Sequence, residues 1–298
     1  RVEYCLINNL DTIAPATVLE AVRKEDKATL VIFNTKKSAL DFYNSTKALN
    51  NWEKKYHLST AMCPAHRKIA IKNISDDLKT KRKIIVASTQ LIEAGVDFDF
   101  PVVFRAMAPL ESIIQAAGRC NRENNLGRLG GRIFIFNMLD GGMPDKTYAA
   151  CASYAGEIIK SDKNLLHDHQ IFNKYYAQVL SLYIDPDKYN VNIARGSFNF
   201  KTVNDSYFII RNATEGLYIY NYNEESRQLF NSIEHKEFLS RDDYRKMQMY
   251  TVQVYQFFMI KNTAMCKLMP QGFKVWYGNY DHDTGISVEP VAADKMIV

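Results

Sequence analysis

The 298-residue sequence has few cysteines, and none of its apolar runs approaches the length of a membrane-spanning helix. The five cysteines are dispersed and form no Cys-x-x-Cys pair, which gives no zinc site and suits a reducing compartment. No secretory leader pattern is visible. We therefore expect a cytoplasmic protein without a membrane partner. The 47% hydrophobic and 24% charged residues are typical of ordinary globular domains.

Two motifs of nucleotide-binding proteins are also missing. The chain has no Gly-x-x-x-x-Gly-Lys-[Ser/Thr] phosphate loop, and it has no Asp-Glu dipeptide of the kind that holds Mg²⁺. We therefore expect that this sequence cannot build an ATP site alone. It begins at Arg1 rather than Met, which suggests a fragment or a processed product.

Positive charge is concentrated in the first half of the chain. Residues 1–150 hold 22 Lys+Arg against 16 Asp+Glu, a net charge of +6, whereas the remainder holds 16 against 17, a net charge of −1. A basic first half fits a polyanionic partner, although a solvated surface is the default interpretation of such an excess.

Short apolar runs that alternate with helix-forming stretches predict an α/β fold with a doubly wound parallel sheet. The expected strands are 29–33, 58–61, 83–87, 102–106 and 132–137; the expected helices are 36–50, 64–78 and one that begins near 110, after an amphipathic segment at 15–23. These elements make up a first domain over residues 1–143.

The pattern changes after Asn137. A turn-rich stretch at 138–144 precedes expected helices at 146–159 and 170–183, which form a helical linker over residues 144–184. Residues 185–298 are rich in Tyr and Asn and predict a small α+β domain. Its expected elements are strands at 207–211 and 217–222, a helix at 242–248, and a hairpin of 274–277 with 286–288.

Polar residues follow the expected strand at 83–87. The carboxyl ends of strands in open α/β sheets face the ligand-binding crevice, so Ser88, Thr89 and Gln90 are placed to hold phosphate oxygens. Gly95 allows the chain to turn sharply and approach a ligand closely. Asp97 supplies an acceptor for a ribose hydroxyl or a neighbouring arginine.

A second cluster follows the expected strand at 102–106. On the expected helix, Gln115, Arg119 and Arg122 have the spacing i, i+4 and i+7, which predicts one face. Two guanidiniums and an amide on one face form a phosphate clamp. Gly118 costs helix stability, so its presence implies the close approach of another surface. The alternative is that both arginines are surface charges or structural ion pairs.

Together the two clusters resemble motifs V and VI of the superfamily 2 helicases, in which Gln-x-x-Gly-Arg-x-x-Arg supplies arginine fingers to ATP. The sequences Thr-Gln-Leu-Ile-Glu-Ala-Gly-Val-Asp at 89–97 and Gln-Ala-Ala-Gly-Arg-Cys-Asn-Arg-Glu at 115–123 are similar to those of the CRISPR-associated helicase-nuclease of type I systems. Weaker motifs at 249–255 and 280–285 extend the resemblance to the family's C-terminal domain. Ile114 and Gln115 argue against DEAD-box helicases, which usually have a His-Arg pair there.

The resemblance implies an ATP-dependent DNA helicase whose second RecA-like domain is residues 1–143. ATP with Mg²⁺ would be bound by an absent first RecA-like domain. Arg119 and Arg122 would reach the γ-phosphate, and Gln115 would position the attacking water or a phosphate. Gly95 and Asp97 would belong to the nucleotide-binding residues, and Asp97 would couple the nucleotide state to the DNA side. On this account Arg119→Ala should abolish turnover while leaving the fold intact.

The resemblance also implies contacts with backbone phosphates of single-stranded DNA. Asn34 and Thr35 belong to motif IV, although such a pair after a strand is also a good helix N-cap. Thr89 and Gln90 would contact the same strand, together with His66 and Arg67, which rest on the resemblance alone. Further implied partners are the N-terminal half of the helicase-nuclease and the CRISPR surveillance complex.

Two other interpretations stay open. The chain could be a non-catalytic docking or regulatory module, or a superfamily 2 translocase acting on RNA, because backbone contacts say little about the 2′-hydroxyl. His167-Asp168-His169 lacks further ligands at metal spacing and predicts no metal site. The C-terminal aromatics could stack on bases, but alternation at Tyr218, Tyr220 and Tyr222 favours packing along one face of a strand.

Overall fold

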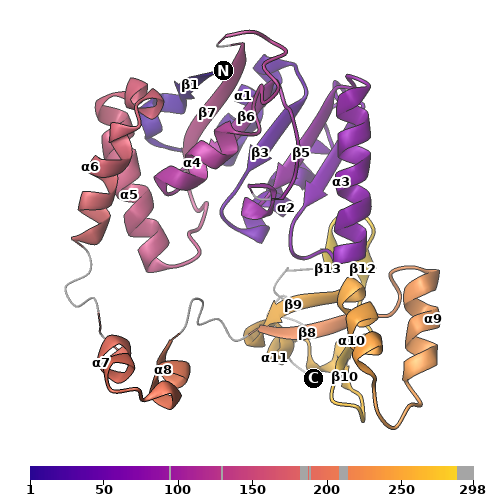
Figure 1. Ribbon diagram of the computed structural model, residues 1–298. Helices are drawn as coiled ribbons and strands as arrows, with labels where there is room; N and C mark the ends of the chain where they lie inside the picture. The colour runs from indigo at the N-terminus through magenta and orange to yellow at the C-terminus, as the bar shows by residue number, and fades with distance from the viewer. Residues whose placement is uncertain (94, 129, 182–186, 188, 208–213, 287–298) are drawn as a thin grey trace, which may run out of the picture.

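The computed structural model describes the chain except residues 94, 129, 182–186, 188, 208–213 and 287–298 (Figure 1). A seven-stranded sheet forms its first half, in the order β1-β7-β6-β3-β5-β4 with β2 paired to β7, and every pairing is parallel. The strands are β1 (Val2–Leu6), β2 (Thr12–Ile13), β3 (Thr29–Ile32), β4 (Lys54–Leu58), β5 (Ile84–Ser88), β6 (Val102–Ala106) and β7 (Gly131–Met138). The predicted doubly wound parallel sheet is thereby confirmed.

Helices cover both faces of this sheet, which is why its central strands are apolar on both sides. The helices α1 (Pro15–Glu25) and α2 (Lys36–Thr46) pack on one face, whose core includes Val31 and Phe104. On the other face lie α3 (Pro64–Lys79), α4 (Leu110–Ala117), α5 (Lys146–Ser161) and α6 (Gln170–Leu180), against Leu30, Ile32 and Val103. Among the described residues, no helix combines the length and apolarity that crossing a bilayer requires.

The expected elements differ from the structure mainly at the sheet edges. β4 ends at Leu58, where the predicted strand at 58–61 begins, and β1 was not predicted at all. Both are edge strands, and the exposed Lys54 and Glu3 interrupt their apolar pattern.

The C-terminal part forms a second sheet in the order β10-β11-β8-β9. Its strands are β8 (Thr214–Ile219), β9 (Thr251–Tyr255), β10 (Cys266–Leu268) and β11 (Lys274–Trp276), and its helices are α9 (Glu224–Ile233), α10 (Arg241–Met247) and α11 (Gln256–Lys261). Two short helices, α7 (Val191–Gly196) and α8 (Phe200–Ser206), precede it in the chain (Figure 1).

The predicted strand at 207–211 falls almost wholly outside the described residues, as does the boundary near residue 184. The predicted hairpin of 274–277 with 286–288 is wrong, because β11 pairs with β8 and β10. Instead β12 (Tyr280–Asp281) pairs with β13 (Gly285–Ile286).

The β12–β13 hairpin joins the C-terminal part to the first sheet. Ile286 donates a backbone hydrogen bond of 2.9 Å to the carbonyl of Ala61, which precedes α3. The amide of Cys63 donates to the Tyr280 hydroxyl at 2.9 Å. Figure 1 shows the hairpin beneath the N-terminal end of α3. This contact places the C-terminal sheet beside the carboxyl ends of β4 and β5.

Candidate nucleic-acid and nucleotide sites

A cavity of about 830 Å³ lies between the carboxyl edge of the first sheet and the C-terminal part. We call it the edge groove. Its first wall comprises Asn34, Thr35, Lys36, Thr60, Thr89, Gln90, Leu91, Met143 and Pro144, and its second comprises Val254, Tyr255, Phe257, Phe258, Lys261, Asn262 and Ile286. β3 and β5 are neighbours with Ile32 opposite Ser88, so the residues that follow both strands meet at this edge. Four predicted DNA-contact residues, Asn34, Thr35, Thr89 and Gln90, therefore line one cavity.

The N-terminus of α2 brings positive charge to the groove. The Thr35 side chain caps this helix by accepting a hydrogen bond of 3.1 Å from the amide of Ser38, as the capping alternative predicts. Burial and the charge of Arg67 both lower the pKa of Lys36. No carboxylate in the described chain forms an ion pair with Lys36 or Arg67. An anion beside these two cations would therefore be stabilised.

The opposite wall of the groove is aromatic. Tyr255 and Phe257 are 54% and 65% exposed, and the ammonium of Lys261 lies 4.2 Å from the centroid of the Phe257 ring. Phe258 instead packs against Trp276, with ring centroids 5.5 Å apart. Exposed aromatic rings beside a cation suit nucleobases, which stack on such surfaces. Tyr218 and Tyr222 are buried, as the predicted packing role requires, but β8 ends at Ile219, so the predicted strand face does not extend to Tyr222.

Asn34 is buried, and its side chain is engaged inside the protein. Its amide nitrogen donates to the carbonyl of Met107 at 2.9 Å, and its amide oxygen accepts from Arg105 at 2.7 Å. Gln90 donates to the hydroxyl of Tyr148 at 3.2 Å. Two of the predicted DNA-contact residues, Asn34 and Gln90, therefore already use polar groups in hydrogen bonds within the protein.

His66 lies outside the edge groove, at the junction with the hairpin. Its Nδ1 is 2.9 Å from the Tyr280 hydroxyl, and its ring stacks on Tyr222 with centroids 5.2 Å apart. Arg67 donates to the carbonyl of Met62 at 2.8 Å. These contacts give His66 a structural role that the sequence did not reveal, since Tyr280 lies more than 200 residues away.

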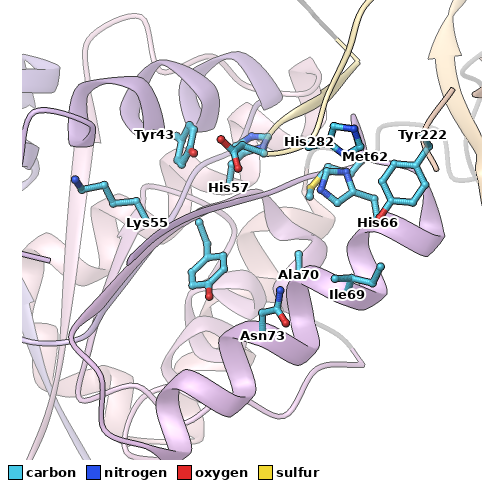
Figure 2. Close-up of a pocket in the computed structure, with 12 residues that line it drawn as sticks. Tyr43, Lys55, His57, Met62, His66, Ile69, Ala70, Asn73, Tyr222 and His282 are labelled. Carbon is cyan, nitrogen blue, oxygen red and sulfur yellow. The ribbon is translucent and has the colours of Figure 1, made fainter. Parts of the chain in front are cut away.

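A smaller cavity of about 240 Å³ adjoins His66 at this junction, and Figure 2 shows its lining. Among the residues around it are Tyr43, His57, His66, Tyr222 and His282. His57 is buried with both ring nitrogens unpaired within the described residues. Burial lowers the pKa of both His57 and His66 to about 4, so both rings are neutral at neutral pH.

The prediction that Gln115, Arg119 and Arg122 lie on one helical face is wrong. α4 ends at Ala117, with Gly118 as its C-cap, so only Gln115 lies on the helix and is exposed there. The following backbone pairs with Phe100, whose amide donates to Arg119 and whose carbonyl accepts from Asn121, each at 2.9 Å. Because this pairing extends the chain, the helix cannot continue to Arg122.

The two arginines consequently have different environments. Arg119 is 8% exposed and donates from Nε to the carbonyl of Ile92 at 3.0 Å and from Nη2 to that of Glu93 at 2.6 Å. Burial and the charge of Arg122 lower the pKa of Arg119. Arg122 is partly exposed and pairs with the exposed carboxylate of Asp97 at 3.0 Å. Arg122 is therefore the more accessible guanidinium.

The segment at 89–97, which resembles motif V, connects the edge groove with Arg122. Gly95 has a φ of +73°, a conformation that favours glycine, and no atom lies within 4 Å of the position a Cβ would take. The segment before it supplies Thr89 and Gln90 to the edge groove, and the segment after it supplies Asp97 to Arg122. One short stretch of chain thus contacts both predicted sites.

Known proteins similar to this chain include CRISPR-associated helicases, and the similarity covers the segment with the candidate sites. A family model described as CRISPR-associated nuclease/helicase Cas3, C-terminal, matches residues 25–125. A CRISPR-associated nuclease/helicase Cas3 from Haloferax volcanii is 37% identical over 128 residues, which are 41% of this chain and 13% of that relative.

Two solved structures extend the likeness along the chain. Cas3-ADP from T. fusca gives a TM-score of 0.60 at 12% identity, over 95% of this chain and 42% of its own. A chain of a CRISPR RNA-guided surveillance complex, pre-nicking, gives 0.60 at 13% identity, over 95% of this chain and 44% of its own. The chain thus spans less than half the length of these structures. The fold is confirmed as RecA-like, and the resemblance to the C-terminal half of this helicase family is confirmed.

Proposed function

We propose that this chain, similar to Cas3 over its helicase core, is the C-terminal half of an ATP-dependent single-stranded DNA helicase of type I CRISPR interference. It would supply arginine fingers and DNA-backbone contacts, while a first RecA-like domain in the N-terminal half would supply the phosphate loop and the Mg²⁺ ligands. The observation that carries the proposal is the continuity of residues 89–97. This segment lines the edge groove at Gln90 and meets Arg122 at Asp97.

The nucleotide side offers groups that fit phosphate oxygens. Two guanidiniums and the exposed amide of Gln115 donate hydrogen bonds and suit the γ-phosphate of ATP. When bound with Mg²⁺, ATP supplies a phosphoryl group that is transferred to water. Arg122 would exchange the Asp97 carboxylate for phosphate as the two halves close, and Gln115 would orient the attacking water. Arg119 would hold the motif V backbone in place and offer Nη1, which has no hydrogen-bond partner in the described structure.

The edge groove offers two kinds of contact with one DNA strand. Lys36 in the groove, with Arg67 near it, would attract backbone phosphates, and Tyr255 and Phe257 would stack on bases. Neither contact reads a base edge, so binding should tolerate any sequence and weaken with salt. Cycles of cleft closure would then move the chain along the strand, and the surveillance complex would deliver that strand.

Titration of a labelled oligothymidylate with this chain tests the groove directly. Phe257→Ala should weaken binding about tenfold, since a stacked base contributes about 1–3 kcal/mol. Phe238→Ala removes a ring that is also exposed but lies outside the groove, and it should leave affinity unchanged. Equal affinity at low and moderate salt, or equal losses in both variants, would contradict the proposal. Tighter binding of the matched RNA would favour the RNA-translocase alternative.

A further inference from the structure

A buried polar cluster lies between the edge groove and Arg119. Its centre is Arg105 on β6, which is fully buried. Arg105 donates from Nη1 to the amide oxygen of Asn34 at 2.7 Å and from Nη2 to the hydroxyl of Tyr148 at 3.0 Å. Its Nη2 also lies 2.9 Å from the carboxylate of Glu93. The guanidinium thus contacts three segments that are far apart in sequence.

The Tyr148 hydroxyl connects this cluster to the groove. It accepts hydrogen bonds from Gln90 at 3.2 Å and from Arg105, and it donates to Asn34 at 3.0 Å. One donor and two acceptors are the full capacity of a hydroxyl. Tyr148 lies on α5, in the expected helical linker, so the linker contacts motif IV and motif V through a single oxygen atom.

Glu93 connects the cluster to the loop that follows α4 and carries Arg119 and Arg122, which we call the finger loop. Its carboxylate pairs with Arg105, and its backbone carbonyl accepts the 2.6 Å hydrogen bond from Arg119. Direct contacts therefore run from Gln90 through Tyr148, Arg105 and Glu93 to Arg119.

The cluster is not completely paired. Arg105 Nε has no hydrogen-bond partner among the described residues, although Arg105 Nη2 and the Glu93 carboxylate are in ionic contact. A buried donor without an acceptor is unfavourable, so Arg105 Nε offers a vacant position to which the Glu93 carboxylate could move. Two accessible arrangements are what a connection between distant sites requires. Burial of an ion pair also adds little net stability, because the cost of removing both charges from water offsets their attraction.

We propose that Arg105 and Tyr148 are positioning residues that transmit occupancy of the edge groove to the loop carrying Arg119 and Arg122. The inference rests on the proposed function, because it takes single-stranded DNA as the occupant of the groove. A strand that draws Gln90 toward its phosphates would release one bond to Tyr148, and Arg105 would then shift its pairing with Glu93. The finger loop would respond to DNA before any contact with ATP.

Hydrogen–deuterium exchange of this chain, with and without saturating oligothymidylate, tests the proposal. In the wild-type chain, DNA should slow exchange of the peptide that contains residues 119–122 by about fivefold to tenfold. Tyr148→Phe removes one oxygen atom and keeps the ring, so the chain should fold and bind DNA within about twofold of wild type, yet lose that response. Arg105→Lys should also lose it, since an ammonium cannot reproduce the forked contacts.

Tyr154→Phe is the matched control. Tyr154 lies on the same helix and packs against the same core, but its hydroxyl has no hydrogen-bond partner in the described structure. It should keep the wild-type response. A full response in Tyr148→Phe, or DNA binding without any response in wild type, would overturn the inference alone. A wild-type chain that does not bind DNA would overturn the proposed function and the inference with it.

Discussion

Arg119 Nη2 donates a 2.6 Å hydrogen bond to the backbone carbonyl of Glu93, which ties motif VI to motif V within this chain. The second bond, from Nε to Ile92, makes the contact bidentate across consecutive carbonyls. Arg119 is therefore a structural residue as well as a candidate finger. The expectation that its removal leaves the fold intact needs revision on this ground.

We predict that Arg119→Ala destabilises the chain by about 2 to 4 kcal/mol, because two carbonyls lose a charged partner in a buried setting. Urea unfolding of the isolated chain measures this change. Arg119→Lys should recover only part of the loss, since one ammonium cannot satisfy both carbonyls as a guanidinium does. A change below about 0.5 kcal/mol for the alanine variant would show that these bonds contribute nothing.

Arg122→Ala should separate stability from turnover. Its side chain is partly exposed and its ion pair with Asp97 is on the surface, so unfolding should change by less than about 0.5 kcal/mol. In the assembled helicase, loss of a finger should lower ATP hydrolysis by about 10³-fold or more. Arg128→Ala, another exposed arginine on the same loop, is the control and should keep normal turnover. Normal hydrolysis in the Arg122 variant would remove it from the catalytic role.

The hairpin junction predicts sensitivity to acid. The pKa values of His57 and His66 are about 4 in the folded chain, below the ordinary 6.5. Between these values the unfolded chain binds protons that the folded chain does not, so stability should fall as pH drops from about 6.5 toward 4. The free energy of unfolding measured at several pH values tests this. His66→Gln should flatten the slope, whereas a slope unchanged from wild type would contradict the assignment.

Two glycines with similar backbone angles offer a test of the junction. Gly285 and Gly272 have φ values of +88° and +87°, so alanine carries the same backbone strain at both. A Cβ at Gly285 would lie 2.3 Å from the carbonyl of Ala61, whereas a Cβ at Gly272 meets nothing within 4 Å. Gly285→Ala should therefore loosen the C-terminal part and speed its proteolysis, and Gly272→Ala should not. Equal rates would mean that the hairpin contact is dispensable.

The central strands could be predicted from the sequence because both of their faces are buried. β3, β5 and β6 are mostly apolar, with the buried Arg105 as the one charged residue in them, and their predicted boundaries differ from the structure by at most one residue. Edge strands carry charged side chains on their exposed side, so β1 gave no such signal and β4 was displaced.

The sequence identified the candidate residues Gln115, Arg119 and Arg122, but it did not predict how they are arranged in space. The spacing of Gln115, Arg119 and Arg122 fits a helix, yet pairing of the backbone with Phe100 ends that helix first. No local pattern could reveal this pairing, because Phe100 lies outside the helical window. The aromatic wall at Tyr255 and Phe257 likewise depends on how the hairpin docks on the first sheet.

The most direct test of the account is ATP hydrolysis with single-stranded DNA present. The chain would be assayed alone and then mixed with an N-terminal half that carries the phosphate loop, with Arg122→Ala in parallel. Hydrolysis should occur only in the mixture and should be lost in the Arg122→Ala variant. A mixture that stays inactive, although both halves fold and bind DNA, would contradict the arginine-finger role and favour a docking or regulatory module.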